Sequence, residues 1–367
     1  MKLYTGALLA LLGASAAQAG GIERTTQSAM ILFSDGNRVE LSFGRVMPKL
    51  TGVMNDSLGS GDIANDFTSP SFALKMDVSE TVALAFIYDK PFGSDVVYDD
   101  GDSVFLSGQA GMAETKAYTF LAKYQATDRV SVFGGIRVQE SGGSTVLDGT
   151  PYNLVLAPAP TPYEVSFGDD WGTGYVLGAA YEIPEMALRL ALTYNSEVEH
   201  SYDTDESFGG ASAGPTSQTK SVTPQSVNLE FQTGLNQRTL LMASARWVEH
   251  SAFQLRPEVF DRELVSLRDT TTYRIGIGRA FTQKLSGSVT YAFEPEGSEN
   301  VSSLSPYNGY KQLSLGLSYK ATEALEISGG ITYRLYGDAN ATVSGTSMGR
   351  FEDNSLTGVG LKMAYTF

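Results

Sequence analysis

The chain contains two histidines, His200 and His250, and each lies between a glutamate and a serine. A Glu-His-Ser trio supplies the acid, the base and the hydroxyl group that a hydrolase uses. Consecutive residues of a strand point to opposite faces of a sheet, however, so these three side chains would not meet. The chain has no cysteine, its paired glycines precede no helix, and its acidic loops lack a complete set of metal ligands. We therefore predict no enzyme activity, no cofactor and no metal site.

The C-terminal segment, residues 355–367, indicates which kind of element positions the side chains. Val359, Leu361, Met363, Tyr365 and Phe367 are large and apolar, and the residues between them are small or polar. A two-residue period places one apolar face against lipid and one more polar face away from it. A last strand of this kind, ending in Phe, is typical of a bacterial outer-membrane barrel.

Segments of this period recur through the whole chain. They are residues 38–47, 71–78, 81–90, 115–125, 129–139, 171–182, 187–196, 225–233, 239–248, 271–279, 285–293, 311–320, 325–336 and 355–367. The links between them alternate without exception between short turns and long stretches rich in Gly, Ser, Asp and Pro. The sequence therefore predicts an all-β fold, a transmembrane antiparallel β-barrel of about 14 strands over residues 38–367, with tight turns at one end and long loops at the other.

The N-terminus predicts export. Lys2 is followed by an apolar run, residues 8–12, and by a small-x-small cleavage site, residues 17–19. We predict a signal peptide over residues 1–19 and a location in the bacterial outer membrane, in contact with lipid and lipopolysaccharide. An uncleaved membrane anchor is the alternative, but the apolar run is shorter than a spanning helix needs.

The composition agrees with this location. Aromatic residues make up 11% of the chain and include 19 Tyr, a residue suited to the level of lipid head groups. The net charge is −15, and the mature chain without Lys2 carries one positive charge fewer. So acidic a protein is not expected to bind nucleic acid, because affinity for phosphates depends on Lys and Arg. The acidic groups are expected in solvated outer loops.

Residues 20–37, between the cleavage site and the first strand, are predicted to form an N-terminal plug in the lumen. Residues 29–33 are apolar and need burial, and residues 34–37 form a turn sequence that would reverse the chain into the wall. An extra strand or a loose tail is the alternative. Small inward residues such as Gly174, Gly178 and Gly276 leave room for a plug. A water-filled porin with an inward-folded loop is another use of that room.

The third strand segment runs directly into Pro91, Phe92 and Gly93. Pro has no N–H group for the strand ladder, and Gly often marks a bulge or a bend. Either the strand ends here, or it kinks and opens a gap in the wall toward the lipid.

The link after the fifth segment contains an unusually apolar stretch, residues 151–163. Most outer loops are polar, so an exposed apolar stretch would be a candidate binding surface. The alternative is an ordered loop that packs on its neighbours.

The plug-like residues 20–37 leading into residues 39–48, the Pro-Phe-Gly sequence after the third segment, and Trp247 before a long outer loop resemble the FadL/TodX family. These are outer-membrane transporters for long-chain fatty acids and other hydrophobic compounds. The resemblance covers essentially the whole mature chain. The chain departs from the family pattern because its plug is short and lacks an Asn-Pro-Ala sequence, which leaves the gating open.

The resemblance implies passive, gated uptake by a monomer. Apolar loop residues would capture the ligand, plug residues would line a luminal pocket, and an inward arginine would hold a carboxylate head group. Release would then occur sideways through the kinked strand. The implied ligand-binding residues are Met30, Ile31, Phe33, Tyr152, Leu154, Leu156, Tyr163, Arg137 and Arg334, and the implied gate residues are Pro91, Phe92 and Gly93.

Two other functions remain open at this point. One is a general diffusion porin for small polar solutes, and the other is a structural or adhesive surface barrel. Large, stable single-channel conductance would favour the porin, whereas a fatty acid bound in the lumen would favour the transporter.

Overall fold

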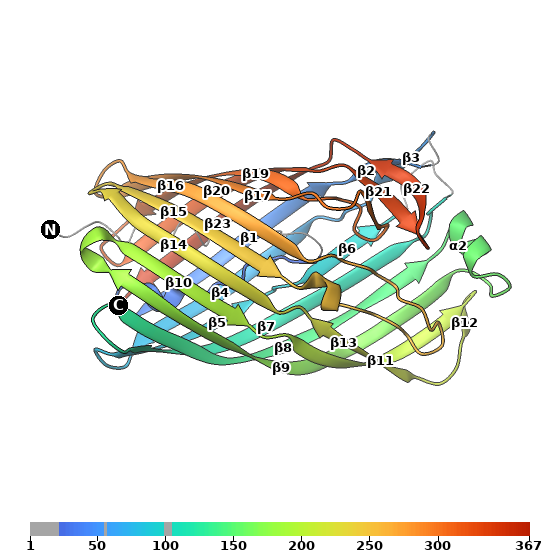
Figure 1. Ribbon diagram of the computed structural model, residues 1–367, viewed down its shortest axis with the longest axis horizontal. Coiled ribbons are helices and arrows are strands. Elements are labelled where there is room, and N and C mark those ends of the chain that lie inside the picture. The colour runs from blue at the N-terminus through green and yellow to red at the C-terminus, as the bar shows by residue number, and fades with distance from the viewer. Residues whose placement is uncertain (1–21, 55–56, 99–104) are drawn as a thin grey trace.

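The computed structural model describes residues 22–54, 57–98 and 105–367, and these form a closed antiparallel β-barrel (Figure 1). The predicted signal peptide, residues 1–19, and the first residues of the predicted plug lie outside the described part. Within the described part the wall has 14 strands, and pairing of β1 with both β4 and β23 closes it. Every predicted segment coincides with a wall strand, so the predicted fold is confirmed.

Three of the wall strands consist of two pieces each. In order around the wall, the strands are β1 (Arg38–Lys49), β4 (Phe67–Asp77), β5 (Val82–Asp89) with β6 (Gly93–Val97), β7 (Ala110–Gln125), β8 (Val130–Leu147), β9 (Tyr163–Ile183), β10 (Leu188–Asn195) with β11 (Val198–Phe208), β13 (Ser217–Thr223) with β14 (Ser226–Asn236), β15 (Thr239–Val248), β16 (Thr270–Ala280), β17 (Leu285–Glu294), β19 (Tyr310–Lys320), β20 (Leu325–Tyr336) and β23 (Ser355–Thr366).

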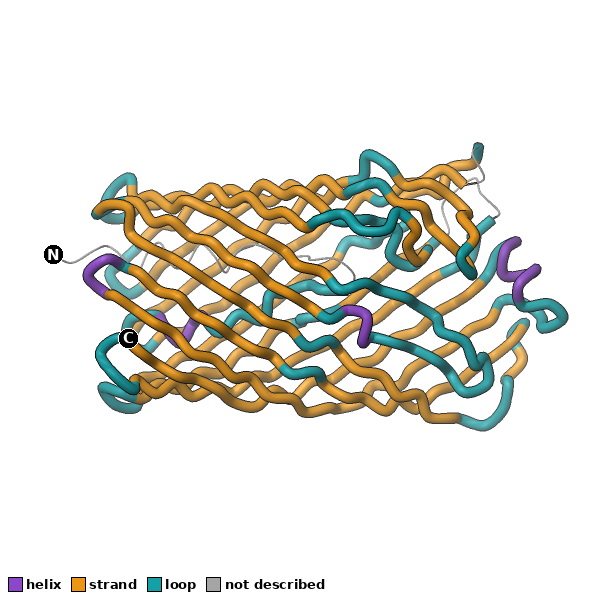
Figure 2. The backbone as a smooth tube through the Cα atoms, in the orientation of Figure 1, coloured by secondary structure: helices purple, strands orange, loops and turns teal. Residues whose placement is uncertain are grey.

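The two ends of the barrel differ, as the alternating links predict (Figure 2). One end, here called the turn end, has short connections such as η2 (Pro184–Met186). The C-terminus also lies at this end. The links toward the other end, here called the loop end, contain α2 (Thr150–Val155), η3 (His250–Ala252), β12 (Ala211–Ser212) and a separate small sheet. That sheet consists of β18 (Asn300–Ser302), β21 (Ala339–Val343), β22 (Thr346–Phe351), β2 (Thr51–Met54) and β3 (Leu58–Asp62).

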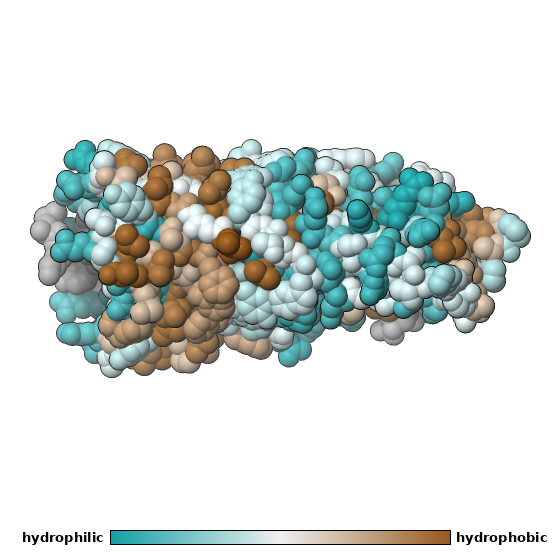
Figure 3. All heavy atoms as spheres, turned by 90° about the horizontal axis from the view of Figure 1, so that it is seen from below, coloured by the Kyte–Doolittle hydropathy of each residue, from teal (hydrophilic) through white to brown (hydrophobic). Residues whose placement is uncertain are grey.

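The outer face of the wall carries an apolar band on the half nearer the turn end (Figure 3). Alternation along each strand produces it: Leu361 is 53% exposed, whereas the next residue, Lys362, is 3% exposed. Aromatic rings lie side by side on the outer face, with the ring centroids of Tyr88 and Tyr118 5.3 Å apart and those of Tyr118 and Trp171 5.9 Å apart. Such rings suit the border between lipid and water.

Some strands extend farther toward the loop end than predicted. β9 begins at Tyr163 rather than at Trp171, and its outward residues there include Glu164 and Ser166. Beyond the apolar band both solvent and the barrel interior accept strand residues, so the outer face no longer needs apolar side chains. The pattern that marks a lipid-facing strand is therefore absent from these extensions.

Apolar side chains fill the lumen at the loop end. This loop-end cluster includes Ile63, Phe92, Tyr98, Leu106, Tyr152, Leu156, Tyr163, Phe167, Phe253 and Phe351, all of them buried. They come from the inner face of the strands and from the long loops, so the loops fold inward over the barrel. None of the helices in the described residues is both long enough and apolar enough to cross a membrane.

Candidate functional site: a gap in the barrel wall and the cavity behind it

The third wall strand is interrupted between β5 and β6. β5 pairs with β4 only as far as Tyr88 opposite Phe72, and β6 resumes pairing with β7 at Gly93. The strand therefore kinks and continues. Residues 67–71 of β4 pair with β1 on one side, but no wall strand in the described part pairs with them on the other. We call the space between these residues and residues 90–97 the wall gap.

Two prolines border the wall gap, Pro70 on β4 and Pro91 on the kinked strand. Pro lacks an N–H group and is tolerated in sheets chiefly at edges and bulges. The two strand edges at the wall gap therefore carry fewer unpaired backbone N–H groups than edges without proline would.

The N-terminal residues 22–28, here called the strap, run along the kinked strand. Gly93 N–H donates to the carbonyl oxygen of Ile22 at 2.6 Å, and Arg24 N–H donates to that of Pro91 at 2.7 Å. Glu23 and Phe92 are thereby bridge partners of an antiparallel pair. Farther along the same flank, opposite β7, β6 is bonded by a loop, with Val97 N–H donating to the carbonyl oxygen of Ile63 at 2.8 Å. The strap and this loop take the place of a neighbouring wall strand.

The Arg24 side chain lies in the wall gap. Its guanidinium carbon is 4.3 Å from the centre of the Phe67 ring. A Cβ at Gly93 would come within 2.6 Å of the guanidinium, so a larger residue at position 93 would displace the Arg24 side chain. Arg24 is 6% exposed.

The opposite side of the strap is bound to β14 and β15 across the lumen. Glu23 pairs with Arg246, and Gln27 accepts a hydrogen bond of 3.0 Å from the same guanidinium. Asn228 donates to the carbonyl oxygen of Thr26 at 2.9 Å. The strap therefore spans the lumen from the wall gap to the facing wall.

After the strap, the chain forms η1 (Met30–Phe33) and packs on the inner face of the wall. The Phe33 ring meets Phe133 edge-on at 5.7 Å, and Phe133 itself lies where a side chain at position 178 would stand. Gly178 thus makes room for the ring that supports η1. Two of the three predicted pocket residues of this segment, Met30 and Ile31, border the cavity described next, whereas Phe33 faces the wall.

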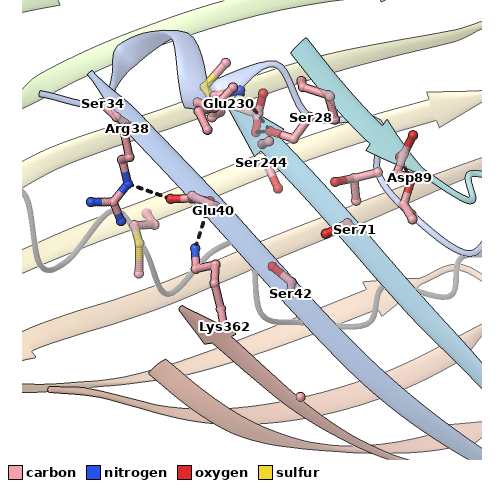
Figure 4. Close-up of a pocket in the computed structure, with 18 of the residues that line it drawn as sticks. Ser28, Ser34, Arg38, Glu40, Ser42, Ser71, Asp89, Glu230, Ser244 and Lys362 are labelled. Carbon is pink, nitrogen blue, oxygen red and sulfur yellow. Dashed lines mark hydrogen bonds and ion pairs between the residues drawn. The ribbon is translucent and has the colours of Figure 1, made fainter. Parts of the chain in front are cut away.

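A cavity of about 380 Å³ lies between the strap, η1 and the facing wall. It extends from Arg24 at the wall gap to Thr322 at the turn end. Most of the residues that line it are polar, among them Glu40, Ser42, Ser71, Asp89, Glu230, Ser244, Arg246 and Arg274. Figure 4 shows Glu40 between Arg38 and Lys362, which donate to it at 2.7 and 3.4 Å.

The two predicted head-group arginines lie outside the lining of this cavity. Arg137 is buried and donates to Thr119 and Asn195, both at 3.0 Å. Arg334 is fully buried, donates twice to Gln312 at 2.7 and 3.0 Å, and stacks over the Tyr310 ring at 3.7 Å. Its Nη1 group has no hydrogen-bond partner within the described residues.

Three of the four predicted capture residues are buried in the loop-end cluster, namely Tyr152, Leu156 and Tyr163. The Tyr163 hydroxyl donates to Glu206 at 2.9 Å, so the loop is fixed by polar as well as apolar contacts. Leu154 on α2 is 76% exposed and is the one of the four that faces solvent. Most of the apolar stretch therefore packs on its neighbours.

His200 on β11 is separated from its sequence neighbours. His200 is buried, with its Nδ1 atom 3.2 Å from an Asp170 carboxylate oxygen. The hydroxyl of the adjacent Ser201 lies on the exposed face and donates to Gln218. The opposite orientation of adjacent strand residues thus separates the Glu-His-Ser trio.

Sequence reasoning missed Glu23 and Arg24. A signal was present, because two charged residues precede an apolar segment that must be buried. It did not reveal their partners, which come from distant strands.

Residues 7–367 match the family described as outer membrane protein transport protein (OMPP1/FadL/TodX). Among solved structures, a Pseudomonas aeruginosa FadL homologue is 16% identical with a TM-score of 0.77, covering 99% of this chain and 98% of that one. The Ralstonia pickettii toluene transporter TbuX is 15% identical with a TM-score of 0.66, covering 96% and 97%. The P. putida toluene transporter TodX is 14% identical with a TM-score of 0.66, covering 99% and 98%.

An outer membrane protein of Neisseria meningitidis serogroup B is 25% identical over 142 residues, which span 31% of this chain and 30% of that protein. The solved structures establish the shared fold, and the family match covers nearly the whole chain. The outer-membrane location and the family resemblance predicted from the sequence are confirmed. The turn end accordingly faces the periplasm and the loop end the cell exterior. The chain belongs to the OMPP1/FadL/TodX family of outer membrane transporters of hydrophobic compounds.

Proposed function

We propose that this chain takes up long-chain fatty acids or other hydrophobic compounds by passive, gated diffusion and releases them sideways through the wall gap. The observation that carries the proposal is the kinked third strand, whose missing neighbour is replaced by the strap. Within a bilayer, backbone polar groups need partners inside the protein. A segment that supplies those partners without belonging to the wall is a natural movable element.

The path begins at the exposed apolar side chain of Leu154 on α2. From there the ligand would pass the loop-end cluster, whose apolar side chains favour an apolar molecule over a polar one. Arg137 or Arg334 would hold a carboxylate head group on this path. The free Nη1 group of Arg334 supports the second choice. The plug residues Met30, Ile31 and Phe33 would contact the ligand in the lumen.

The gate itself comprises Pro91, Phe92 and Gly93 together with the strap. Displacement of the strap would break the two hydrogen bonds that Ile22 and Arg24 make to the kinked strand. The prolines at both edges of the gap lower the number of donors left without partners. No energy source is needed, since the ligand moves down its own gradient.

A general diffusion porin for polar solutes is the second candidate, and the many polar residues that line the cavity as far as the turn end favour it. The apolar filling of the loop end is unfavourable for such a route. A large and stable conductance in a planar bilayer would support the porin.

A disulfide between strap and gate tests the lateral route. Glu23 and Phe92 are a non-hydrogen-bonded antiparallel pair, whose Cα atoms lie about 4.5 Å apart, within the range of a disulfide. The chain has no cysteine, so the double variant Glu23→Cys, Phe92→Cys would carry a unique bridge. We expect the oxidised variant to lose uptake of labelled fatty acid by cells and the reduced variant to regain it.

The reduced protein is the folding control for the oxidised one, and the two single variants control for each substitution. Equal uptake by the oxidised and reduced double variant, with the bridge verified by mass spectrometry, would contradict release through the wall gap.

A further inference from the structure

The guanidinium of Arg24 is buried at the wall gap without an anionic partner. It makes no ion pair within the described residues, and its Nε group has no hydrogen-bond partner there. The two carboxylates close to it are engaged elsewhere: Glu114 pairs with Lys90, and Asp95 accepts from Asn65 at 2.9 Å. Burial of an unpaired charge is costly, so this position is suited to receive an anion.

Most other cations around the cavity are already engaged. Arg189 is buried and makes no ion pair within the described residues, but it donates to Gln232 at 3.0 Å and lies over the Phe33 ring. Arg38 and Lys362 contact Glu40, and Arg246 contacts Glu23. Arg274 and Lys320 also lack an ion-pair partner in the described part, but both are half-exposed, so solvent can satisfy them. Arg24 combines burial with the absence of a partner.

Arg24 lies where the cavity meets the wall gap. The residue borders the cavity of about 380 Å³, and its guanidinium lies against Phe67 and Gly93 at the edge of the wall. The gap opens beside Tyr88, whose ring belongs to the aromatic pairs on the outer face. Such rings mark the level at which the head group of a membrane amphiphile rests.

We propose that Arg24 is the anion-binding residue of the gate. It pairs with the carboxylate of an amphiphile while the tail passes between β4 and the kinked strand, so carboxylic amphiphiles are preferred over neutral molecules of equal chain length. The planar guanidinium suits a carboxylate, because it can donate two parallel hydrogen bonds. This inference rests on the proposed function and narrows its substrate class.

The test is a comparison of palmitate, hexadecanol and hexadecane binding to purified protein in a nonionic detergent, at a pH where palmitate is ionised. We expect the wild-type protein to prefer palmitate to hexadecanol, and Arg24→Gln to weaken palmitate binding about tenfold, the size of a lost charge-assisted hydrogen bond. Hexadecanol affinity should stay unchanged. Arg24→Lys, which keeps the charge without the planar fork, should retain part of the preference.

Arg45→Gln is the matched control, because Arg45 is an exposed arginine on the neighbouring strand β1, where it pairs with Asp66. It should bind all three ligands as the wild type does. Arg274→Gln discriminates between the two unpaired arginines. Heat-dependent gel mobility of each variant checks that the barrel is folded.

Four results would overturn the inference. An unchanged ratio of palmitate to hexadecanol affinity in Arg24→Gln is one, and loss of the preference in Arg274→Gln instead is another. A wild-type protein that binds palmitate and hexadecanol equally well would refute the role of Arg24 and leave the proposed function intact. A wild-type protein that binds none of the three ligands would refute the proposed function itself, and this inference with it.

Discussion

Glu23 and Arg246 form a buried ion pair across the lumen and tie the strap to β15, the wall strand that faces the gap. Glu23 is 1% and Arg246 is 5% exposed, so neither charge is solvated. Arg246 also donates to Gln27 and to Asn228, at 3.0 and 2.6 Å. One guanidinium therefore gathers the contacts that hold the strap in its position.

This arrangement predicts that the two partners are not equivalent. Arg246→Leu would leave the Glu23 carboxylate buried without compensation, at a cost of about 3–5 kcal/mol, and should release the strap. Glu23→Gln should have a smaller effect, because its amide oxygen can still accept from Arg246. The measurement is labelling of a Thr26→Cys reporter by a membrane-impermeant thiol reagent, which we expect to accelerate at least tenfold in Arg246→Leu.

The exposed pair Arg45 and Asp66 supplies the control, since Arg45→Leu should leave the labelling rate unchanged. If the reporter reacts at one rate in all of these proteins, the ion pair does not hold the strap.

Leu154 is expected to act in ligand capture. Leu154→Ser should raise the half-saturating concentration for fatty-acid uptake several-fold and leave the maximal rate unchanged, because the side chain is 76% exposed and its loss removes apolar surface without disturbing the core. Initial uptake rates over a range of ligand concentrations measure both quantities. Leu235→Ser is the matched control, since Leu235 is 55% exposed at the periplasmic end. Equal effects of the two substitutions would argue against capture at α2.

His250 is expected to make the loop end sensitive to acid. The pKa of His250 is lowered to about 3, first by burial and then by the nearby Arg246 cation. In the unfolded chain the pKa of histidine is about 6.5. Below that pH the unfolded state binds a proton that the folded state does not, so the free energy of unfolding decreases as the pH falls from about 6.5 toward 3.

The variant His250→Leu removes this effect. Neither ring nitrogen of His250 has a hydrogen-bond partner within the described residues, so leucine loses no such bond there. Between pH 7 and pH 4.5, the thermal midpoint of the wild-type protein in detergent should fall more than that of His250→Leu. The same decrease in both proteins would show that other groups determine the acid response.

The sequence alone predicted the number and order of the wall strands. Period-two alternation is a local property, since each strand must present one face to lipid whatever its neighbours are. The alternation also marks Gly178 as an inward residue that leaves room, although it does not identify Phe133 as the ring that occupies this space. For the same local reason Pro91 and Gly93 mark an interruption of the third strand, although the sequence alone does not distinguish a strand end from a kink.

The apolar stretch at residues 151–163 shows where local reasoning stops. Tyr152, Leu156 and Tyr163 are buried and Leu154 is exposed, yet all four read alike in the sequence. Which side chains of a loop face inward depends on how the loop folds over the barrel, and that depends on other loops.

The composition of the gate was decided by the tertiary structure. Glu23 meets Arg246 across 223 positions of sequence, and Arg24 reaches Gly93 on a strand that follows two others. The sequence around a charged residue near the N-terminus does not indicate which distant residue it contacts. Closure of the barrel brings these groups together, because it fixes which strands face each other across the lumen and leaves the strap one path between them.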